Sequence, residues 1–244
     1  MEINFNGKRT LVTGASQGIG RELVKKLVAC GAKVVAVARN KELLEKLQKE
    51  VPSIEIFAAD LADWKRTEEV LTQIGDIDLL VNNAALAILA PLTEAKEEDV
   101  NRIFAINVKA VINISKYVVT NLLARKVPGT IVNISSQASV VGLNNHTLYC
   151  ASKGAVDAFT RAAAQEYGKY GIRFNNVNPT VILTDMGRLG WSDPKIAAPM
   201  LEKIPLRRFG EVDEVVNAII FLLSDMSSMT TGSNLYVDGG FVAV

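Results

Sequence analysis

The sequence predicts a single α/β domain in which helices cover both faces of a doubly wound parallel sheet of about seven strands. Short runs rich in β-branched residues alternate with longer stretches of helical periodicity, which is the pattern of consecutive βαβ units. The short runs are apolar throughout, as expected for strands that are buried on both faces. The chain has 244 residues, of which 49% are hydrophobic, and this suits one domain with a large core.

Seven segments are expected to form the strands, because each is a short apolar run bounded by polar or turn-forming residues. In chain order they are Thr10–Thr13, Lys33–Ala38, Ile54–Ala58, Leu79–Val81, Thr130–Ile134, Arg173–Val177 and Leu235–Val237. Amphipathic stretches between them are expected to form the covering helices. These are Arg21–Ala29, Lys41–Glu50, Val100–Leu123, Lys153–Tyr167 and Val212–Ser224.

One irregular region, residues 180–209, is rich in glycine and proline and breaks this alternation. No repeat, low-complexity tract or linker is visible elsewhere, so residues 1–244 are expected to form one domain. Long ordered segments in compact domains are often lids over binding sites. We therefore expect residues 180–209 to form a substrate lid.

The charge balance, the cysteine count and the lengths of the apolar runs argue against several classes of partner and location. Lys and Arg total 27 against 26 Asp and Glu, which argues against a nucleic-acid or anionic-membrane partner. Two cysteines, Cys30 and Cys150, are too few for a disulfide framework or a metal cluster, so no metal site is expected. Apolar runs are too short for a membrane span, and the segment Met1–Phe5 lacks the features of a signal peptide. A cytoplasmic location is expected.

A glycine-rich turn joins the first expected strand to the first expected helix. Backbone N–H groups and a helix N-terminus at such a turn can bind a diphosphate, as in Rossmann-type folds. The spacing is G-x-x-x-G-x-G rather than the commoner G-x-G-x-x-G, so an ordinary tight turn is an alternative. The residues expected to bind a dinucleotide here are Gly14, Ser16, Gln17, Gly18, Ile19 and Gly20.

The end of the second strand predicts which dinucleotide is bound. NAD-binding folds usually carry an acid here that accepts from the ribose 2′-hydroxyl. This chain has Arg39 and Asn40 instead. A guanidinium matches the oxygens of a 2′-phosphate, so NADP(H) is favoured. A solvated arginine with no ligand is the alternative.

Polar residues also close the third and fourth strands. Asp60 and Leu61 follow the third strand, where an acid can accept from the adenine amino group. Asn82, Asn83 and Ala84 close the fourth strand, beside the switch point at which doubly wound sheets bind ligands. Turn chemistry alone is the alternative for the two asparagines.

Tyr149 and Lys153 are spaced to share one helix face, where residues four apart have Cβ atoms about 5–6 Å apart. A nearby ammonium favours a phenolate, so we expect a lowered pKa for Tyr149 and a role as general acid. Ser136 lies just beyond a buried strand and is expected at the same end of the sheet. A surface helix pair is the alternative for Tyr149 and Lys153.

These motifs, in this order, resemble the short-chain dehydrogenase/reductase family over essentially the whole chain. The resemblance implies hydride transfer with Tyr149 as acid/base and Ser136 holding the substrate oxygen. It further implies that Lys153 binds the nicotinamide ribose and that Asn107 orders a proton-relay water. The family usually has Gly where this chain has Thr180, which concerns local backbone shape only. The matching residues are Thr13, Gly14, Gly18, Gly20, Asp60, Asn82, Asn83, Ala84, Asn107, Ser136, Tyr149, Lys153, Asn178, Pro179 and Thr184, and Ile182 is a further implied cofactor contact.

Several segments resemble, more narrowly, one group within this family. Its members are NADPH-dependent, tetrameric reductases of small ketoses and α-dicarbonyl compounds, so a homo-oligomer and a small-molecule substrate are implied. The segments are Asn145–Cys150, Val177–Val181, Gly190–Pro194, Met229–Ser233 and the Val-Asp-Gly-Gly-Phe tail.

Three residues are expected to bind substrate alongside Ser136 and Tyr149: Gln137, His146 and Trp191. Neutral donors and acceptors suit a hydroxylated substrate. A locally bonded loop residue is the alternative for His146, and lid packing is the alternative for Trp191.

For the whole protein, the alternatives are a 3-oxoacyl or steroid reductase, which would need a more apolar cleft, and an NADP-binding regulatory protein without turnover.

Overall fold

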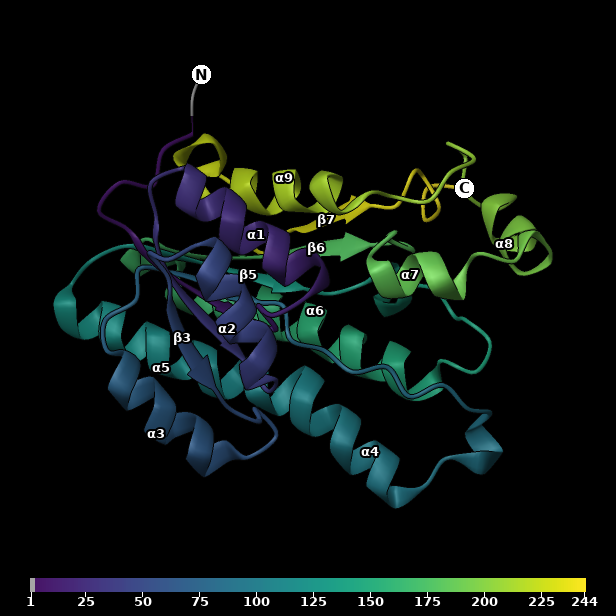
Figure 1. Ribbon diagram of the computed structural model, residues 1–244, viewed down its shortest axis with the longest axis horizontal. Helices are drawn as coiled ribbons and strands as arrows, with labels where there is room; N and C mark the ends of the chain where they lie inside the picture. The colour runs from purple at the N-terminus through teal and green to yellow at the C-terminus, as the bar shows by residue number, and fades with distance from the viewer. Residues whose placement is uncertain (1–2) are drawn as a thin grey trace.

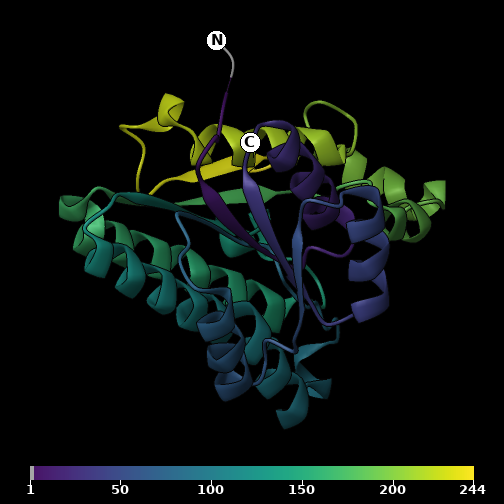
Figure 2. The ribbon, with the colours of Figure 1, turned by 60° about the vertical axis from the view of Figure 1, so that its left-hand side comes forward.

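The computed structural model describes residues 3–244, and its centre is a parallel sheet of seven strands (Figures 1 and 2). The strand order is β3-β2-β1-β4-β5-β6-β7, so the order reverses between β1 and β4 at the expected switch point. The strands are β1 (Arg9–Thr13), β2 (Lys33–Ala38), β3 (Glu55–Ala58), β4 (Leu79–Asn82), β5 (Gly129–Ile134), β6 (Ile172–Pro179) and β7 (Asn234–Val237). The predicted fold class and all seven predicted strands are confirmed, with end shifts of one or two residues.

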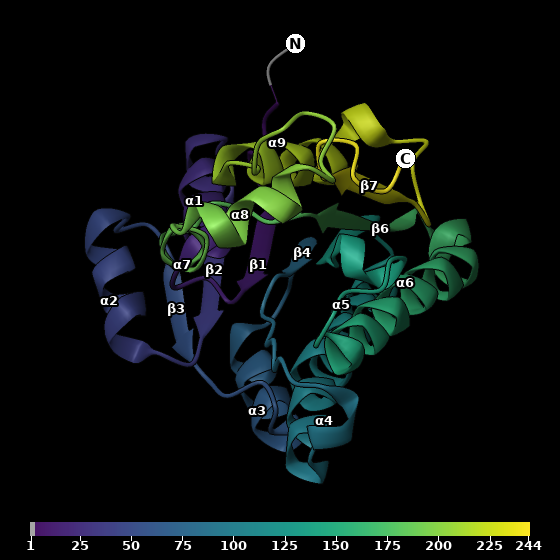
Figure 3. The same ribbon diagram turned by 90° about the vertical axis from the view of Figure 1, so that its right-hand side faces the viewer.

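Helices form one layer on each face of this sheet (Figure 3). Buried residues of α1, α2 and α9 pack together on one face, and those of α3, α5 and α6 pack on the other. The helices are α1 (Gly18–Ala29), α2 (Lys41–Glu50), α3 (Trp64–Ile74), α4 (Glu97–Phe104), α5 (Ala110–Arg125), α6 (Thr147–Tyr167), α7 (Asp185–Gly190), α8 (Pro194–Leu201) and α9 (Val212–Leu223).

The two layers hold the sheet by burying their apolar faces. Leu23 of α1 and Leu44 of α2 have no exposed surface on one side, and Leu122 of α5 has none on the other. Each such leucine contributes about 1.5–3 kcal/mol relative to an exposed one. The sheet is therefore covered on both faces, and a ligand is expected at the carboxyl ends of its strands.

The helices differ most from the prediction in three places, while α1 begins at Gly18 instead of Arg21 and α9 ends at Leu223 instead of Ser224. The helix predicted as Lys153–Tyr167 begins at Thr147, so Tyr149 lies on the same helix as Lys153. The stretch predicted as Val100–Leu123 runs from Glu97 to Arg125 and is interrupted by a π-helical turn at Ala105–Lys109. α3 was missed, although its N-cap is a recognisable signal: the side chain of Asp63 accepts from the backbone N–H of Arg66.

The predicted lid is more regular than expected. It contains two short helices, α7 and α8, which lie beyond the C-terminal end of β6 (Figure 1). Thr184 caps α7 by accepting from the Gly187 N–H at 3.1 Å, and Asp193 caps α8 by accepting from the Lys195 N–H at 2.9 Å. Local capping therefore overrides the breaking effect of the glycines and prolines in this segment.

One helical stretch is long and apolar. Glu97–Arg125 spans 29 residues with a mean hydropathy of 1.3 in its most apolar window, so length and composition alone would allow a membrane span. Within the fold, 56% of that window is buried. Its apolar residues therefore pack against the sheet and neighbouring helices, as in a core helix.

Candidate active site

The glycine-rich turn fits tightly against the end of β4. Gly14 has a φ of +63°, and a Cβ atom there would lie 2.8 Å from the Cα of Ala84. A Cβ atom at Gly20 would lie 2.3 Å from the carbonyl oxygen of Gly14. Side chains at these two positions would push the turn away from the sheet, so the close approach depends on glycine.

Hydrogen bonds lock this turn across the switch point. The amide of Asn83 donates to the carbonyls of Thr13 at 3.0 Å and Gly14 at 3.1 Å. The hydroxyl of Thr13 accepts in return from the backbone N–H groups of Asn83 and Ala84, both at 3.0 Å. Asn83 is therefore a structural anchor of the turn as well as a residue facing the cavity.

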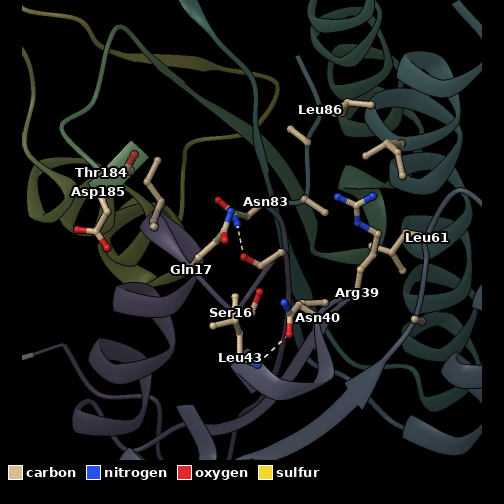
Figure 4. A pocket seen from close by; sticks show the side chains of 18 of the residues that line it. Ser16, Gln17, Arg39, Asn40, Leu43, Leu61, Asn83, Leu86, Thr184 and Asp185 are labelled. Carbon is tan, nitrogen blue, oxygen red and sulfur yellow. Dashed lines mark hydrogen bonds between the residues drawn. The ribbon is translucent and has the colours of Figure 1, made fainter. Parts of the chain in front are cut away.

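A cavity of about 910 Å³ lies at this edge of the sheet (Figure 4). Arg39 and Leu61 lie on one side of it, Thr184 and Asp185 on the other, and Gln17 and Asn83 between them. It is lined by Gly14, Ser16, Gln17, Gly18, Ile19, Ala38, Arg39, Asn40, Leu43, Ala59, Leu61, Asn83, Ala84, Ala85, Leu86, Ile106, Thr184, Asp185 and Leu189.

Most of the predicted cofactor residues are therefore brought together. Gly20, Asp60, Pro179 and Ile182 do not line this cavity, and neither do Tyr149 and Lys153. Most of the cavity-lining residues that the sequence does not predict are apolar. Leu43 had one usable signal, because it follows Asn40, whose side chain caps α2 by accepting from the Leu43 N–H at 3.0 Å.

The cavity fits a dinucleotide on three grounds. Its volume is in the usual range for ligand pockets, about 300–1,000 Å³. The N-terminus of α1 opens onto it through Gly18, which suits a diphosphate. Arg39 provides a guanidinium on the wall where NAD-binding folds place an acid.

Asp60 is held beside this cavity by an arginine. Its carboxylate accepts from Arg102 at 2.8 Å and from the backbone N–H of Ala62 at 3.1 Å. Desolvation acts to raise the pKa of Asp60, but these two hydrogen bonds and the charges of Arg102 and Arg39 outweigh it, so the pKa is lowered. Asp60 is thus an ionised acceptor, and its expected contact with adenine stays a prediction.

Asn107 lies in the π-helical turn and is almost completely buried. Its side-chain amide donates to the Leu86 carbonyl at 2.9 Å and to the Ser152 hydroxyl at 3.0 Å, and its side-chain oxygen accepts from the Leu86 N–H at 2.8 Å. The asparagine therefore ties the segment after β4 to α6. π-helical turns often occur at functional sites.

The proton-transfer residues meet where α6 crosses the end of β5. Ser136 follows β5 and lies close enough to the phenol of Tyr149 to act on its pKa. The Lys153 ammonium lies 5.6 Å from the centre of the Tyr149 ring and donates to the Ile134 carbonyl at 2.7 Å. The three residues that the sequence placed at this edge are therefore assembled.

The expected direction of the Tyr149 pKa is wrong. Burial raises this pKa, and the opposing effect of Ser136 is smaller. The charge of Lys153 favours a lower pKa, but desolvation outweighs it, and desolvation also acts on the lysine. Burial lowers the pKa of Lys153 to about 8, although the charge of Asp157 raises it. Tyr149 consequently keeps its proton at neutral pH, which suits a general acid.

The predicted substrate residues lie in different surroundings. His146 stands next to α6, with its ring centre 6.3 Å from that of Tyr149, and its Nδ1 is 2.6 Å from the Asn144 carbonyl oxygen. Gln137 is buried beside Ser136, and its side-chain oxygen has no hydrogen-bond partner among residues 3–244 as described. Trp191 packs on Phe209 within the small apolar core of the lid, with ring centres 5.2 Å apart. Roles in substrate binding stay predictions for all three.

Comparisons with known proteins agree with this geometry. Residues 14–242 match a family model described as enoyl-(acyl carrier protein) reductase. The chain is 54% identical to L-xylulose reductase of Bos taurus and 47% identical to carbonyl reductase [NADPH] 2 of Sus scrofa, with 100% of both chains covered in each case. Among solved structures, a putative 2-deoxy-D-gluconate 3-dehydrogenase from Agrobacterium tumefaciens with bound NADP matches with a TM-score of 0.92 and 32% identity, covering 100% of this chain and 99% of that one.

Proposed function

The chain belongs to the short-chain dehydrogenase/reductase family, and from that premise we propose that it is an NADPH-dependent reductase of L-xylulose, giving xylitol, and of small α-dicarbonyl compounds. The observation that carries the proposal is the assembly of Ser136, Tyr149 and Lys153 at the sheet edge that also bears the dinucleotide-sized cavity. Full-length identity above one half to a reductase of that name supports the substrate.

NADP(H) is proposed to bind along the cavity between the glycine-rich turn and Thr184. The N-terminus of α1 binds the diphosphate, because its backbone N–H groups have no partner within the helix. Arg39 and Asn40 bind the 2′-phosphate, and Asp60 binds the adenine amino group. Solved relatives with bound NADP support this cofactor.

When bound, the reduced nicotinamide supplies the hydride. Tyr149 donates its phenolic proton to the substrate carbonyl oxygen, and its raised pKa keeps that proton in place until it is needed. Ser136 donates a hydrogen bond to the same oxygen and fixes its position. Lys153 carries a positive charge beside the phenol and stabilises the phenolate that remains after proton transfer.

The substrate is proposed to bind between α6 and the lid. Gln137 has a buried, unpartnered acceptor beside Ser136, which suits a substrate hydroxyl. His146 adds a polar group next to Tyr149, and Trp191 holds the lid in place. We further propose a homotetramer, because exposed apolar residues near the C-terminus, including Val244, would be covered by another subunit. A cytoplasmic location is proposed separately, on the composition of the chain.

The test is NADPH oxidation measured with a panel of L-xylulose, diacetyl and an acetoacetyl thioester. The thioester represents the 3-oxoacyl alternative. The matching family is named for a reductase of acyl groups, which makes this comparison necessary. We expect turnover with L-xylulose and diacetyl and at most slow turnover with the thioester. Preference for the thioester would replace the proposal with the acyl alternative, and no turnover with any member would favour a regulatory protein.

A further inference from the structure

A buried carboxylate lies behind the proton-transfer residues. Asp157 is four residues after Lys153 on α6, and only 3% of its surface is exposed. Its carboxylate accepts from the Ser135 hydroxyl at 2.6 Å, from the Asn176 amide at 2.9 Å and from the Asn234 amide at 2.8 Å. One side chain of α6 thus binds residues of β6 and β7 and the residue that follows β5.

A fourth donor extends this set to the substrate-binding serine. The amide of Asn178, at the end of β6, lies 3.2 Å from the Asp157 carboxylate. The same amide donates to the backbone carbonyl of Ser136 at 3.1 Å and to the Ser139 hydroxyl at 3.0 Å. Ser135 and Asn178 therefore connect the Asp157 carboxylate to the backbone of Ser136, so the position of that backbone depends on Asp157.

Burial of such a carboxylate is energetically unfavourable. Removing a charge from water costs several kcal/mol, and apolar residues of similar volume often stabilise a fold as well or better. None of the hydrogen-bond donors to Asp157 named above is charged, and no ion pair is formed between Asp157 and Lys153 within the described residues. Stability alone therefore gives no reason for a charge at this position.

The negative charge of Asp157 can act on one nearby charged side chain, that of Lys153. Tyr149, Lys153 and Asp157 are spaced four residues apart on α6, so they share one face of the helix, and the Lys153 ammonium lies 5.6 Å from the centre of the Tyr149 ring. The segments packed against this part of α6 present uncharged groups: the Ile134 carbonyl from β5, Ser136 and Gln137 from the turn after it, and Asn107 from the π-helical turn. Arg173 of β6 is bonded to Ser227 and the Ser224 carbonyl instead.

We propose that Asp157 is a positioning residue of the reductase. Its carboxylate holds Ser136 in place through Ser135 and Asn178, and its negative charge keeps the buried Lys153 ammonium protonated. This role deepens the proposed function and rests on it. In agreement, the charge of Asp157 raises the Lys153 pKa against the larger lowering effect of burial.

The direct test is a pH titration of Lys153 in the cofactor-free protein. The protein carries lysine labelled with ¹³C at the ε-carbon, and NMR records the chemical shift of that carbon at each pH. The Lys153 resonance is identified by its absence in Lys153→Met. In the wild type it should titrate near a pKa of about 8, the value that results from burial and the opposing charge of Asp157 together. In Asp157→Asn, which keeps the shape and removes the charge, its pKa should fall by about one pH unit or more.

Thr160→Val is the matched control. Thr160 is buried on the same helix and donates to Asn176 at 2.6 Å, so its loss breaks the same network without changing a charge. The Lys153 pKa should stay at its wild-type value in this variant. An unchanged pKa in Asp157→Asn would overturn the proposal, and so would equal shifts in both variants, because general loosening would then explain them.

Ser135→Ala covers the case in which Asp157→Asn does not fold. This variant removes one hydroxyl and keeps the carboxylate, so folding should be preserved. On the best substrate of the wild type, kcat should fall by about 10- to 100-fold with little change in the NADPH dissociation constant, since a misplaced Ser136 affects only the reacting oxygen. Wild-type kcat would contradict the proposal. Failure of the proposed function itself would be visible separately, as an inactive wild type with a normal Lys153 titration.

Discussion

The proposed catalytic frame, formed by α6 with the ends of β5 and β6, and the proposed lid, formed by residues 180–209, lie at the same edge of the sheet but are built differently. In the frame, Lys153 and Asp157 are each only 3% exposed and are held by hydrogen bonds. In the lid, Leu189 is 79% exposed and Ile196 is 55% exposed. A small apolar cluster that includes Ile204 is the core of the lid.

This difference separates two tasks. A fixed, desolvated frame sets pKa values and holds reacting groups without reorganisation, which is what the chemical step needs. We propose that the smaller, partly exposed lid moves to admit substrate and exclude water. Changes in the frame should therefore act mainly on kcat, and changes in the lid should act mainly on KM.

The largest expected effect is that of Tyr149→Phe, in the frame. This change removes the proton donor and keeps the ring, so reduction should fall by about 10²–10⁴-fold while NADPH still binds. Steady-state rates and a fluorescence titration with NADPH measure the two quantities. Activity within about tenfold of wild type would show that another group donates the proton.

Arg39→Asp should have the next largest effect, on cofactor choice. The ratio of kcat/KM for NADPH to that for NADH should fall by roughly 10- to 100-fold, because a charged hydrogen bond to phosphate is lost and a 2′-hydroxyl acceptor is gained. The change lies outside the frame, so kcat at saturating cofactor should hold. If the ratio stays constant, Arg39 does not contact the 2′-phosphate.

His146→Leu tests the boundary between frame and lid. The KM for L-xylulose should rise several-fold, by about 1 kcal/mol of lost hydrogen bonding, and the KM for diacetyl should change less. NADPH affinity, measured in the same protein, should be unchanged. Equal losses for both substrates would assign His146 a structural role, consistent with its contact to the Asn144 carbonyl.

Trp191→Leu should have the smallest effect. It loses the ring contact with Phe209 but keeps an apolar side chain, so the lid should loosen without unfolding. We expect KM to rise by roughly two- to threefold for both substrates, as for the loss of about 0.5 kcal/mol of aromatic packing, with kcat unchanged. A kcat loss comparable to that of a frame variant would remove the distinction between the two regions.

The sequence predicts the frame better than the lid, for physical reasons. Strand ends are specified by local patterns, so Ser136 and Asn83 could be placed at one edge before any coordinates were known. The Tyr149–Lys153 pair follows from helical spacing, but the direction of the Tyr149 pKa depends on burial, which a local pattern does not give. The network around Asp157 joins residues 19 to 77 positions apart, and no local signal predicts it.

In the lid, the same local reasoning misjudged α7 and α8. Glycine and proline predict irregular structure there, whereas Thr184 and Asp193 cap short helices. Whether Trp191 faces substrate depends on its tertiary contact with Phe209, which the sequence does not reveal. Residues that act through long-range packing are therefore the ones that sequence analysis leaves undecided.

The most direct measurement of the central claim follows the transferred atoms. Wild-type protein is incubated with L-xylulose and NADPH carrying deuterium at both positions of nicotinamide carbon 4, and the product is analysed by NMR and mass spectrometry. The account predicts xylitol with one deuterium at the former carbonyl carbon, formed in equal amount to NADP⁺ and lost in Tyr149→Phe. Xylitol without deuterium, or NADPH consumption without xylitol, would contradict direct reduction of the ketose at this site.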